Sequence, residues 1–261
     1  MTSAVDIIIP LRDGGSEHGD LEAKFLLRSV ARNCEGVGNV YLVTKTKPTW
    51  ASDIVRHVSV ADLRKHNKDG NIIDKLHAGC KAAESEWIVW TCDDCAFVRH
   101  IDLRNLPVTR NCRGRERFSN VGTWSRRMRY TFDTIKATIG CYLPYNYDSH
   151  CPQPYKRTGL IDIIEHHRSV WDKDEGGVCV NTYCQSLAVF LGFAKGKIAL
   201  DQREIKSTWE SGGNGGKCDL MAARGGSIRT PAIVGYNDAG WDGGVGAALK
   251  RMFPEKCKYE A

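Results

Sequence analysis

Two adjacent aspartates, Asp93 and Asp94, are the residues of this sequence best suited to chemistry. They directly follow an apolar run, residues 86–91, which we expect to be a buried strand. Ligands of parallel α/β sheets bind beyond the carboxyl ends of the strands, so the pair stands where such proteins carry out their chemistry. Neighbouring carboxylates can hold Mg²⁺ or Mn²⁺, which bind one or two carboxylates together with phosphate oxygens. A solvated turn is the competing interpretation, because aspartate is common in turns.

His150 and Lys75 are further candidates for the same chemistry. His150 lies in an irregular loop, residues 142–155, where a neutral imidazole can ligate a metal or hydrogen-bond a leaving phosphate. Lys75, which the pattern places at a helix start before the aspartate pair, can reach a phosphate. A structural histidine and a solvated helix lysine are the alternatives.

An arginine-rich stretch indicates a second kind of chemistry. Between residues 110 and 130 the chain carries seven arginines, three aromatic residues and one acidic residue. Positive charge with interleaved aromatic rings is typical of nucleic-acid binding through phosphate contacts and base stacking. The alternatives for this stretch are a solvated loop and a segment that binds the donor diphosphate. The residues selected as acceptor contacts are Arg113, Arg115, Arg117, Trp124, Arg126 and Arg127.

An α/β scaffold is expected to position these side chains. Short apolar runs predict strands at residues 5–10, 39–44, 56–60 and 86–91. Helical spacing predicts helices at residues 21–32, 71–84, 160–170 and 182–193. The order strand, helix, strand indicates a mainly parallel sheet with crossover helices. Residues 211–216 and 225–226 predict flexible glycine-rich connections, and residues 235–246 form a further glycine-rich stretch.

The composition limits the class of protein. A chain of 261 residues suits one α/β domain, and its net charge of +6 favours a phosphorylated or otherwise anionic partner. We expect no signal peptide and no membrane span, hence a cytoplasmic protein whose eleven cysteines are reduced. Most cysteines are interpreted as small buried hydrophobes. A zinc site built on the C-x-x-C spacing of Cys92 and Cys95 would need Cys179 and Cys184 as its second pair.

Several segments, in order along the chain, resemble motifs of known sugar-transferring enzymes. Residues 29–33, 39–44 and 48–50 resemble a block of Stealth-type sugar-phosphate transferases. Residues 90–94 resemble the W-x-N-D-D motif of GT-A-fold glycosyltransferases found in bacteriophages and prophages. Residues 148–152, 181–183 and 253–260 resemble that group's D-x-H-x-P, T-x-Y-G-N and F-P-x-x-S-x-[FY]-E motifs. The sequence departs from the motifs at Cys92, Cys184, Gln185 and Cys257, which replace Asn, Gly, Asn and Ser.

The resemblance implies a single GT-A domain over residues 1–261, a Rossmann-like nucleotide-diphospho-sugar transferase fold with a mainly parallel sheet and an irregular C-terminal region. Residues 1–100 would bind the nucleotide-sugar, and residues 101–261 would bind the acceptor. A UDP-sugar or similar donor is implied, with Mn²⁺ or Mg²⁺ held by Asp93 and Asp94 near His150. The expected donor contacts are Pro10, Arg12, Asp13, Lys75 and Asp93.

The resulting hypothesis is transfer of a sugar from a nucleotide-sugar to a hydroxyl acceptor. Candidate catalytic bases are Asp148, Asp201 and Glu210. The phage-like motifs and the arginine stretch favour DNA carrying a hydroxymethylated pyrimidine as acceptor, which for a phage-encoded enzyme places it in the host cytoplasm. A bacterial surface glycan as acceptor, transfer of a sugar-1-phosphate, and a non-catalytic nucleic-acid-binding module are the alternatives.

Overall fold

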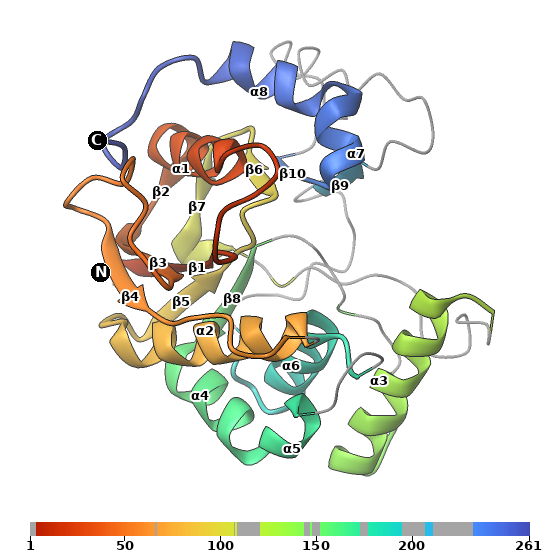
Figure 1. Ribbon diagram of the computed structural model, residues 1–261. Helices are drawn as coiled ribbons and strands as arrows, with labels where there is room; N and C mark the ends of the chain where they lie inside the picture. Colours follow the sequence, from red (N-terminus) through yellow and green to blue (C-terminus); the bar gives the residue numbers. More distant parts are fainter. Residues whose placement is uncertain are drawn as a thin grey trace.

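The computed structural model describes residues 4–65, 67–106, 108, 121–143, 147, 152–172, 177–194, 207–210 and 232–261. It is a mixed α/β structure with a central, mostly parallel sheet of five strands in the order β4–β3–β1–β5–β8 (Figure 1). The strands of this sheet are β1 (Val5–Pro10), β3 (Val37–Thr44), β4 (Arg56–Ser59), β5 (Trp87–Trp90) and β8 (Gln153–Lys156). Only β8, at one edge, runs antiparallel to its neighbour. The arrangement confirms the predicted α/β class and is compatible with a Rossmann-like fold.

Helices cover both faces of the sheet, as Figure 1 shows. The helices are α1 (Leu21–Asn33), α2 (Lys68–Ala82), η1 (Leu103–Asn105), α3 (Thr123–Ile139), α4 (Arg157–His166), α5 (Arg168–Trp171), α6 (Val180–Phe190), α7 (Asp238–Gly240), η5 (Trp241–Val245) and α8 (Gly246–Met252). Ile7 and Ile9 of β1 lie in the core beneath α1, whereas Ile8 lies in the core beneath α2, α4 and α6. Because both faces are covered, a central strand must be apolar throughout, which explains the continuous apolar run in β1.

A second, smaller sheet continues from the end of β5. Its strands are β6 (Cys95–Phe97), β10 (Ile233–Tyr236) and β9 (Ser207–Glu210), in the order β6–β10–β9. Two short strands, β2 (Cys34–Glu35) and β7 (Ile101–Asp102), form a separate pair. Strand β10 thus brings a segment from near the C-terminus directly beside residues that follow β5.

The expectation of an irregular C-terminal region is wrong for the described residues after 231. The glycine-rich stretch 235–246 contains the end of β10 and the helical turns α7 and η5, followed by α8. Apolar packing overrides the low helix propensity of glycine here, because Trp241, Val245 and Leu249 are buried against the small sheet and α1. Gly246 is required by that packing, since a Cβ at this position would lie 2.6 Å from the Trp241 ring.

Two other boundaries differ from those predicted. Helix α2 begins at Lys68, where the Asn67 side chain accepts a hydrogen bond from the backbone N–H of Gly70, so Lys75 lies in mid-helix rather than at its start. The predicted helix at residues 160–170 is two helices, α4 and α5, with a break at His167. Part of the arginine-rich stretch is also helical, because α3 begins at Thr123.

The C-terminal residues are fastened to α1 by a largely buried ion pair. The Arg28 guanidinium donates two hydrogen bonds to the Glu260 carboxylate, with N–O distances of 2.7 and 2.8 Å, and a third to the Phe253 carbonyl at 3.0 Å. The two side chains are 13% and 3% exposed. No helix among the described residues combines the length and apolarity needed to cross a membrane.

Removing one partner of this pair should destabilise the whole fold. Arg28→Ala leaves a buried carboxylate unpaired, so we expect the free energy of unfolding to fall by about 3 kcal/mol. Urea unfolding followed by circular dichroism measures the change. The matched control is Lys47→Ala, because Lys47 pairs with a fully exposed Asp53 and should change stability by less than about 0.5 kcal/mol. Equal losses of unfolding free energy in the two variants would show that the Arg28–Glu260 pair stabilises the fold no more than an exposed ion pair does.

Candidate functional site

The Asp93–Asp94 pair lies where the two sheets meet. β5 ends at Trp90, and the next backbone N–H, that of Thr91, donates to the Ile8 carbonyl of β1 at 3.2 Å. On the other side, the Tyr236 N–H at the end of β10 donates to the Asp94 carbonyl at 3.0 Å. The pair is therefore held at the carboxyl ends of β1, β5 and β10 together, as the sequence predicted for β5.

The pKa values of Asp93 and Asp94 are higher than those of aspartates in ordinary solvated turns. Burial, followed by the nearby Glu22 carboxylate, raises the pKa of Asp93 to about 6. Burial and then the negative charge of Asp93 raise the pKa of Asp94 to about 8. The ammonium group of Lys68, the first residue of α2, acts in the opposite direction on both. Perturbed carboxyl groups of this kind are frequent at functional sites.

The loop after β1 and the first turn of α1 bring further acidic groups to the same place. Asp20 precedes α1 with a left-handed backbone (φ 61°), and its carboxylate accepts hydrogen bonds from the Ser16 N–H and the Trp50 indole. A Cβ at Gly15 would lie 2.7 Å from that carboxylate, so the tight loop needs glycine there. Glu22 is only 4% exposed, and burial raises its pKa.

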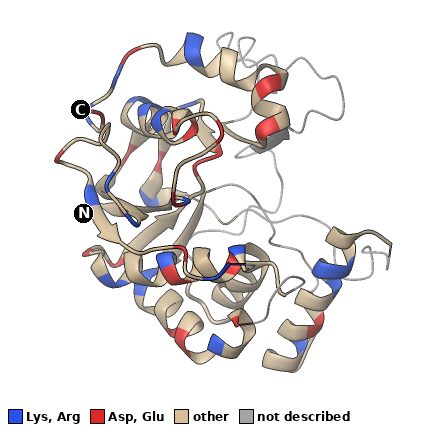
Figure 2. Ribbon diagram, viewed as in Figure 1, with Lys and Arg blue, Asp and Glu red and all other residues tan. Residues whose placement is uncertain are grey.

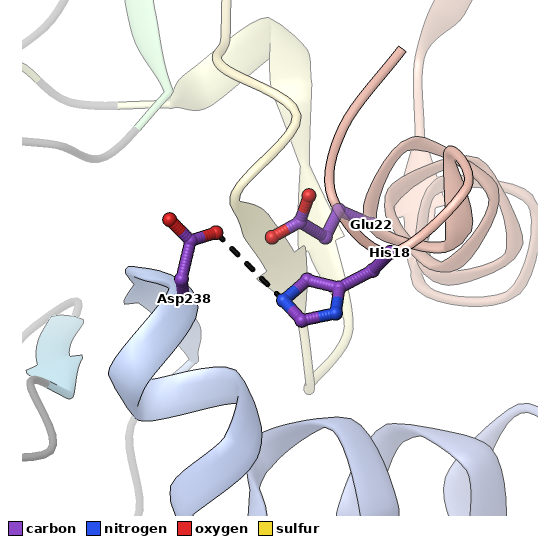
Figure 3. Close-up of side chains that lie close together, drawn as sticks. All are labelled: His18, Glu22 and Asp238. Atoms are coloured by element: carbon purple, nitrogen blue, oxygen red, sulfur yellow. Dashed lines mark ion pairs between the residues drawn. The ribbon is translucent and has the colours of Figure 1, made fainter.

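A histidine and two carboxylates converge beside the pair. One ligand atom from each of His18, Glu22 and Asp238 lies within 4.8 Å of the other two. Figure 3 shows the three side chains pointing toward one another, from the loop before α1, from α1 and from α7. His18 Nε2 and Asp238 Oδ1 are 3.7 Å apart, and the His18 ring stacks on Trp241 with centroids 5.3 Å apart.

Tyr236 adds a buried hydroxyl group to this region. Its side chain is fully buried, and none of the residues that the structure describes forms a hydrogen bond with the hydroxyl. Burial and the negative charges of Cys95, Glu22, Asp94 and Asp93 raise its pKa, so the hydroxyl lies within electrostatic range of the carboxylates. An unpartnered hydroxyl at this depth calls for a specific explanation.

The predicted donor residues take two different positions. Pro10 ends β1, and Arg12 is exposed just beyond it. Lys75 is 2% exposed and already has partners: its ammonium group donates to the Leu11 carbonyl at 2.6 Å and to Asp13 at 3.1 Å, and it pairs with Asp62 at 2.6 Å. These contacts give Lys75 and Asp13 a role in holding the loop after β1. Their predicted contacts with a donor stay predictions.

The described acceptor residues also differ from one another. Trp124 and Arg126 are exposed in the first turns of α3, whereas Arg127 pairs with Asp69 and donates to the Gly177 and Val178 carbonyls. Figure 2 shows basic segments on α3 and acidic segments on α7, on opposite sides of the main sheet. Other predicted site residues lie outside the described residues or outside the described side chains: Arg113, Arg115, Arg117, Asp148, His150, Asp201 and Glu210.

Sequence reasoning did not identify His18, Glu22, Asp238 or Lys68. One signal was available, since each of them follows a strand or opens a helix, the positions that line the carboxyl edge of an α/β sheet. The zinc alternative finds no support in the described part of the chain, where the cysteines are free thiols and the three-ligand group contains none of them. Burial raises the pKa of Cys92 and Cys184, as expected for apolar thiols.

Comparison with known proteins gives no family for the chain. No protein-family model matches it, and no curated protein matches its sequence. Function is therefore inferred from the residues and their geometry.

Without divalent cations, the stability of the protein should fall as the pH rises from about 4 to about 8. The folded-state pKa values of Asp93 (about 6) and Asp94 (about 8) lie above the unfolded value of about 3.9, so the folded state keeps protons that the unfolded state has lost. That advantage is present at low pH and is lost as the pH passes each folded-state pKa. Each pH unit between the unfolded and the folded pKa of a group costs about 1.4 kcal/mol, so the expected loss is several kcal/mol. Urea unfolding in the presence of a chelator measures it.

Asp94→Asn removes the larger of the two titrations and should flatten the slope. The variant should also be more stable than the wild type at the alkaline end. Asp53→Asn, at a fully exposed side chain, is the control and should leave the slope unchanged. Equal slopes for the wild type and Asp94→Asn would show that this carboxyl group is not the one that titrates.

Proposed function

We propose that this chain is a metal-dependent glycosyltransferase of the GT-A type, which transfers a sugar from a nucleotide-sugar, with a UDP-sugar as the first choice, to a hydroxyl acceptor. The observation that carries the proposal is the Asp93–Asp94 pair at the carboxyl end of β5, inside a group of carboxylates with a large excess of negative charge. The parallel order of β4, β3, β1 and β5 supports it, because nucleotides bind at this edge in Rossmann-like sheets.

The carboxylates fit a divalent cation. Glu22 interacts electrostatically with each of four other carboxylates: Asp20, Asp93, Asp94 and Asp238. Lys68 is exposed at the border of this group. Oxygen ligands of this kind suit Mn²⁺ and Mg²⁺, which would supply positive charge against the departing diphosphate. Asp94 is proposed as the principal ligand, with Asp93 supporting it or contacting the ribose. His150 remains a predicted partner.

The reaction breaks the bond between the sugar C1 and the phosphate oxygen and forms a bond between C1 and the acceptor oxygen. The acceptor proton passes to a carboxylate base. Of the predicted bases, Glu210 ends β9, and its backbone is in register with Tyr236 of β10, next to the acidic group. Asp148 and Asp201 stay open as predictions.

Positive charge for the phosphates is proposed to come from exposed side chains. Arg12 follows β1 and Lys68 opens α2, both at the carboxyl edge of the sheet. Lys75 acts indirectly, by fixing the loop that carries Arg12. Charge placed around the leaving diphosphate is expected to be the largest catalytic contribution.

DNA with a hydroxymethylated pyrimidine is the proposed acceptor. The exposed Trp124 and Arg126 at the start of α3 support it, because an exposed aromatic ring and an exposed guanidinium group suit base stacking and phosphate contact. An enzyme acting on a base in a duplex must also take that base out of the stack.

Nucleotide-sugar hydrolysis gives a first test. With Mn²⁺ present, one sugar of a UDP-sugar panel should be released slowly in the absence of acceptor, and the same sugar should raise the melting temperature. Asp94→Asn should lower the rate by about 100-fold or more, as for loss of a group that stabilises developing charge. Asp53→Asn serves as the control. Sugar transfer by Asp94→Asn at near wild-type rate would overturn the proposal.

Arg126 and Arg127 form a matched pair for testing the acceptor. Arg126→Ala should weaken binding of hydroxymethylated duplex DNA several-fold. It should also reduce the slope of log binding constant against log salt concentration by about one, as for the loss of one phosphate contact. Arg127→Ala should instead lower stability, because it leaves Asp69 without its partner. Binding is measured by fluorescence anisotropy at two salt concentrations.

The outcomes separate the competing functions. Failure of the wild type to bind DNA at low salt would exclude DNA and leave a surface glycan as the acceptor. Binding of DNA without any metal-dependent hydrolysis of a nucleotide-sugar would favour a non-catalytic nucleic-acid-binding module.

A further inference from the structure

His18, Glu22 and Asp238 come from segments at opposite ends of the chain and meet beside the small sheet (Figure 3). We propose that they form a second cation site, distinct from the Asp93–Asp94 pair and selective for a divalent transition metal of the Mn²⁺ type. The proposal does not depend on sugar transfer, because it concerns metal binding alone.

The spacing of the ligand atoms fits one ion. Ligands in the first shell of a small divalent cation are roughly 3 to 3.5 Å apart. The three ligand atoms here lie within 4.8 Å of one another, and His18 Nε2 and Asp238 Oδ1 are 3.7 Å apart. That separation is too long for a hydrogen bond but close to the distance across one ion. The Asp238 side chain is 65% exposed and can make the small contraction required.

Two buried polar atoms independently point to a ligand. His18 Nε2 is buried and has no hydrogen-bond partner among the described residues, and stacking on Trp241 fixes the ring in this orientation. Tyr236 is fully buried, and its hydroxyl has no hydrogen-bond partner in the same part of the chain, although it lies within range of the Glu22 charge. A cation would satisfy the imidazole nitrogen, and a water on the cation would give the hydroxyl its partner.

The charge of Glu22 leads to the same conclusion. Its carboxylate is 4% exposed, accepts a hydrogen bond from Ser16, and faces two further negative charges, Asp20 and Asp238. A buried carboxylate surrounded by like charges is costly unless it is paired or bound to a metal. Among the largest influences on Glu22, His18 acts against these two negative charges.

The ligand set decides the class of metal. One imidazole nitrogen with two carboxylates favours Mn²⁺, Zn²⁺ or another transition metal over Mg²⁺ and Ca²⁺, which prefer oxygen ligands only. A metal held here would join the loop after β1 to α7 and fix both against the Asp93–Asp94 pair.

Mn²⁺ is the probe for the test, because the free cysteines of the chain would also capture Zn²⁺. The full chain carrying Asp93→Asn and Asp94→Asn, which disables the first site, is titrated with Mn²⁺ and followed by electron paramagnetic resonance. We expect one bound Mn²⁺ per chain, with the nitrogen coupling of a histidine ligand in pulsed spectra. Mg²⁺ at equal concentration should displace little of it.

Adding His18→Gln to this background should abolish the nitrogen coupling and weaken binding at least tenfold. Asp238→Asn, at a side chain that is 65% exposed, should weaken binding by a similar factor but keep the coupling. His100→Gln, at an exposed histidine, is the control and should leave both readouts unchanged.

Absence of Mn²⁺ binding in the Asp93→Asn, Asp94→Asn background would overturn the second site. Binding that survives His18→Gln and Asp238→Asn would do the same, since it would mark an adventitious ion only. Failure of sugar transfer leaves these measurements unaffected, so the two proposals can fail separately.

Discussion

The central physical constraint in this molecule is the concentration of negative charge where the two sheets meet. The negative charge of Glu22 disfavours ionisation of Asp93 and Asp94, the charge of Asp93 adds to the effect on Asp94, and burial adds to the cost for all three. Such an arrangement lowers the stability of the protein at neutral pH when no cation is bound. Natural sequences keep such unfavourable arrangements mainly at functional sites, so the acidic group indicates a functional site.

The surrounding scaffold has to compensate for this repulsion, and its contacts are placed accordingly. Lys75 ties the loop after β1 to Asp13 and Asp62, and Arg28 ties α1 to the C-terminal Glu260. Both ion pairs are largely buried and hydrogen-bonded, so they fix the two segments that carry His18 and Glu22. Lys75, which the sequence suggested for phosphate binding, therefore supports the site through these contacts, and its contact with a phosphate stays a prediction.

The elements that could be predicted from sequence are those whose pattern is local. β1, β3 and β5 are apolar runs, and α1 and α2 have clear helical spacing, so the sheet and the position of Asp93–Asp94 followed from them. The turns α7 and η5 could not be predicted, because tertiary packing of Trp241 outweighs the glycine content. His18 and Asp238 meet only because β10 pairs with β6, a long-range contact that leaves no periodic signal in the chain.

The distribution of charge also bears on how an anionic acceptor would approach. A phosphate backbone is repelled by carboxylates at the α1–α7 side of the sheet and attracted by exposed arginine on α3 (Figure 2). If the acceptor is a polyanion, its phosphates would be drawn toward α3 and away from the acidic group. Cations bound among the carboxylates would weaken the repulsion there, so metal and acceptor should favour each other's binding.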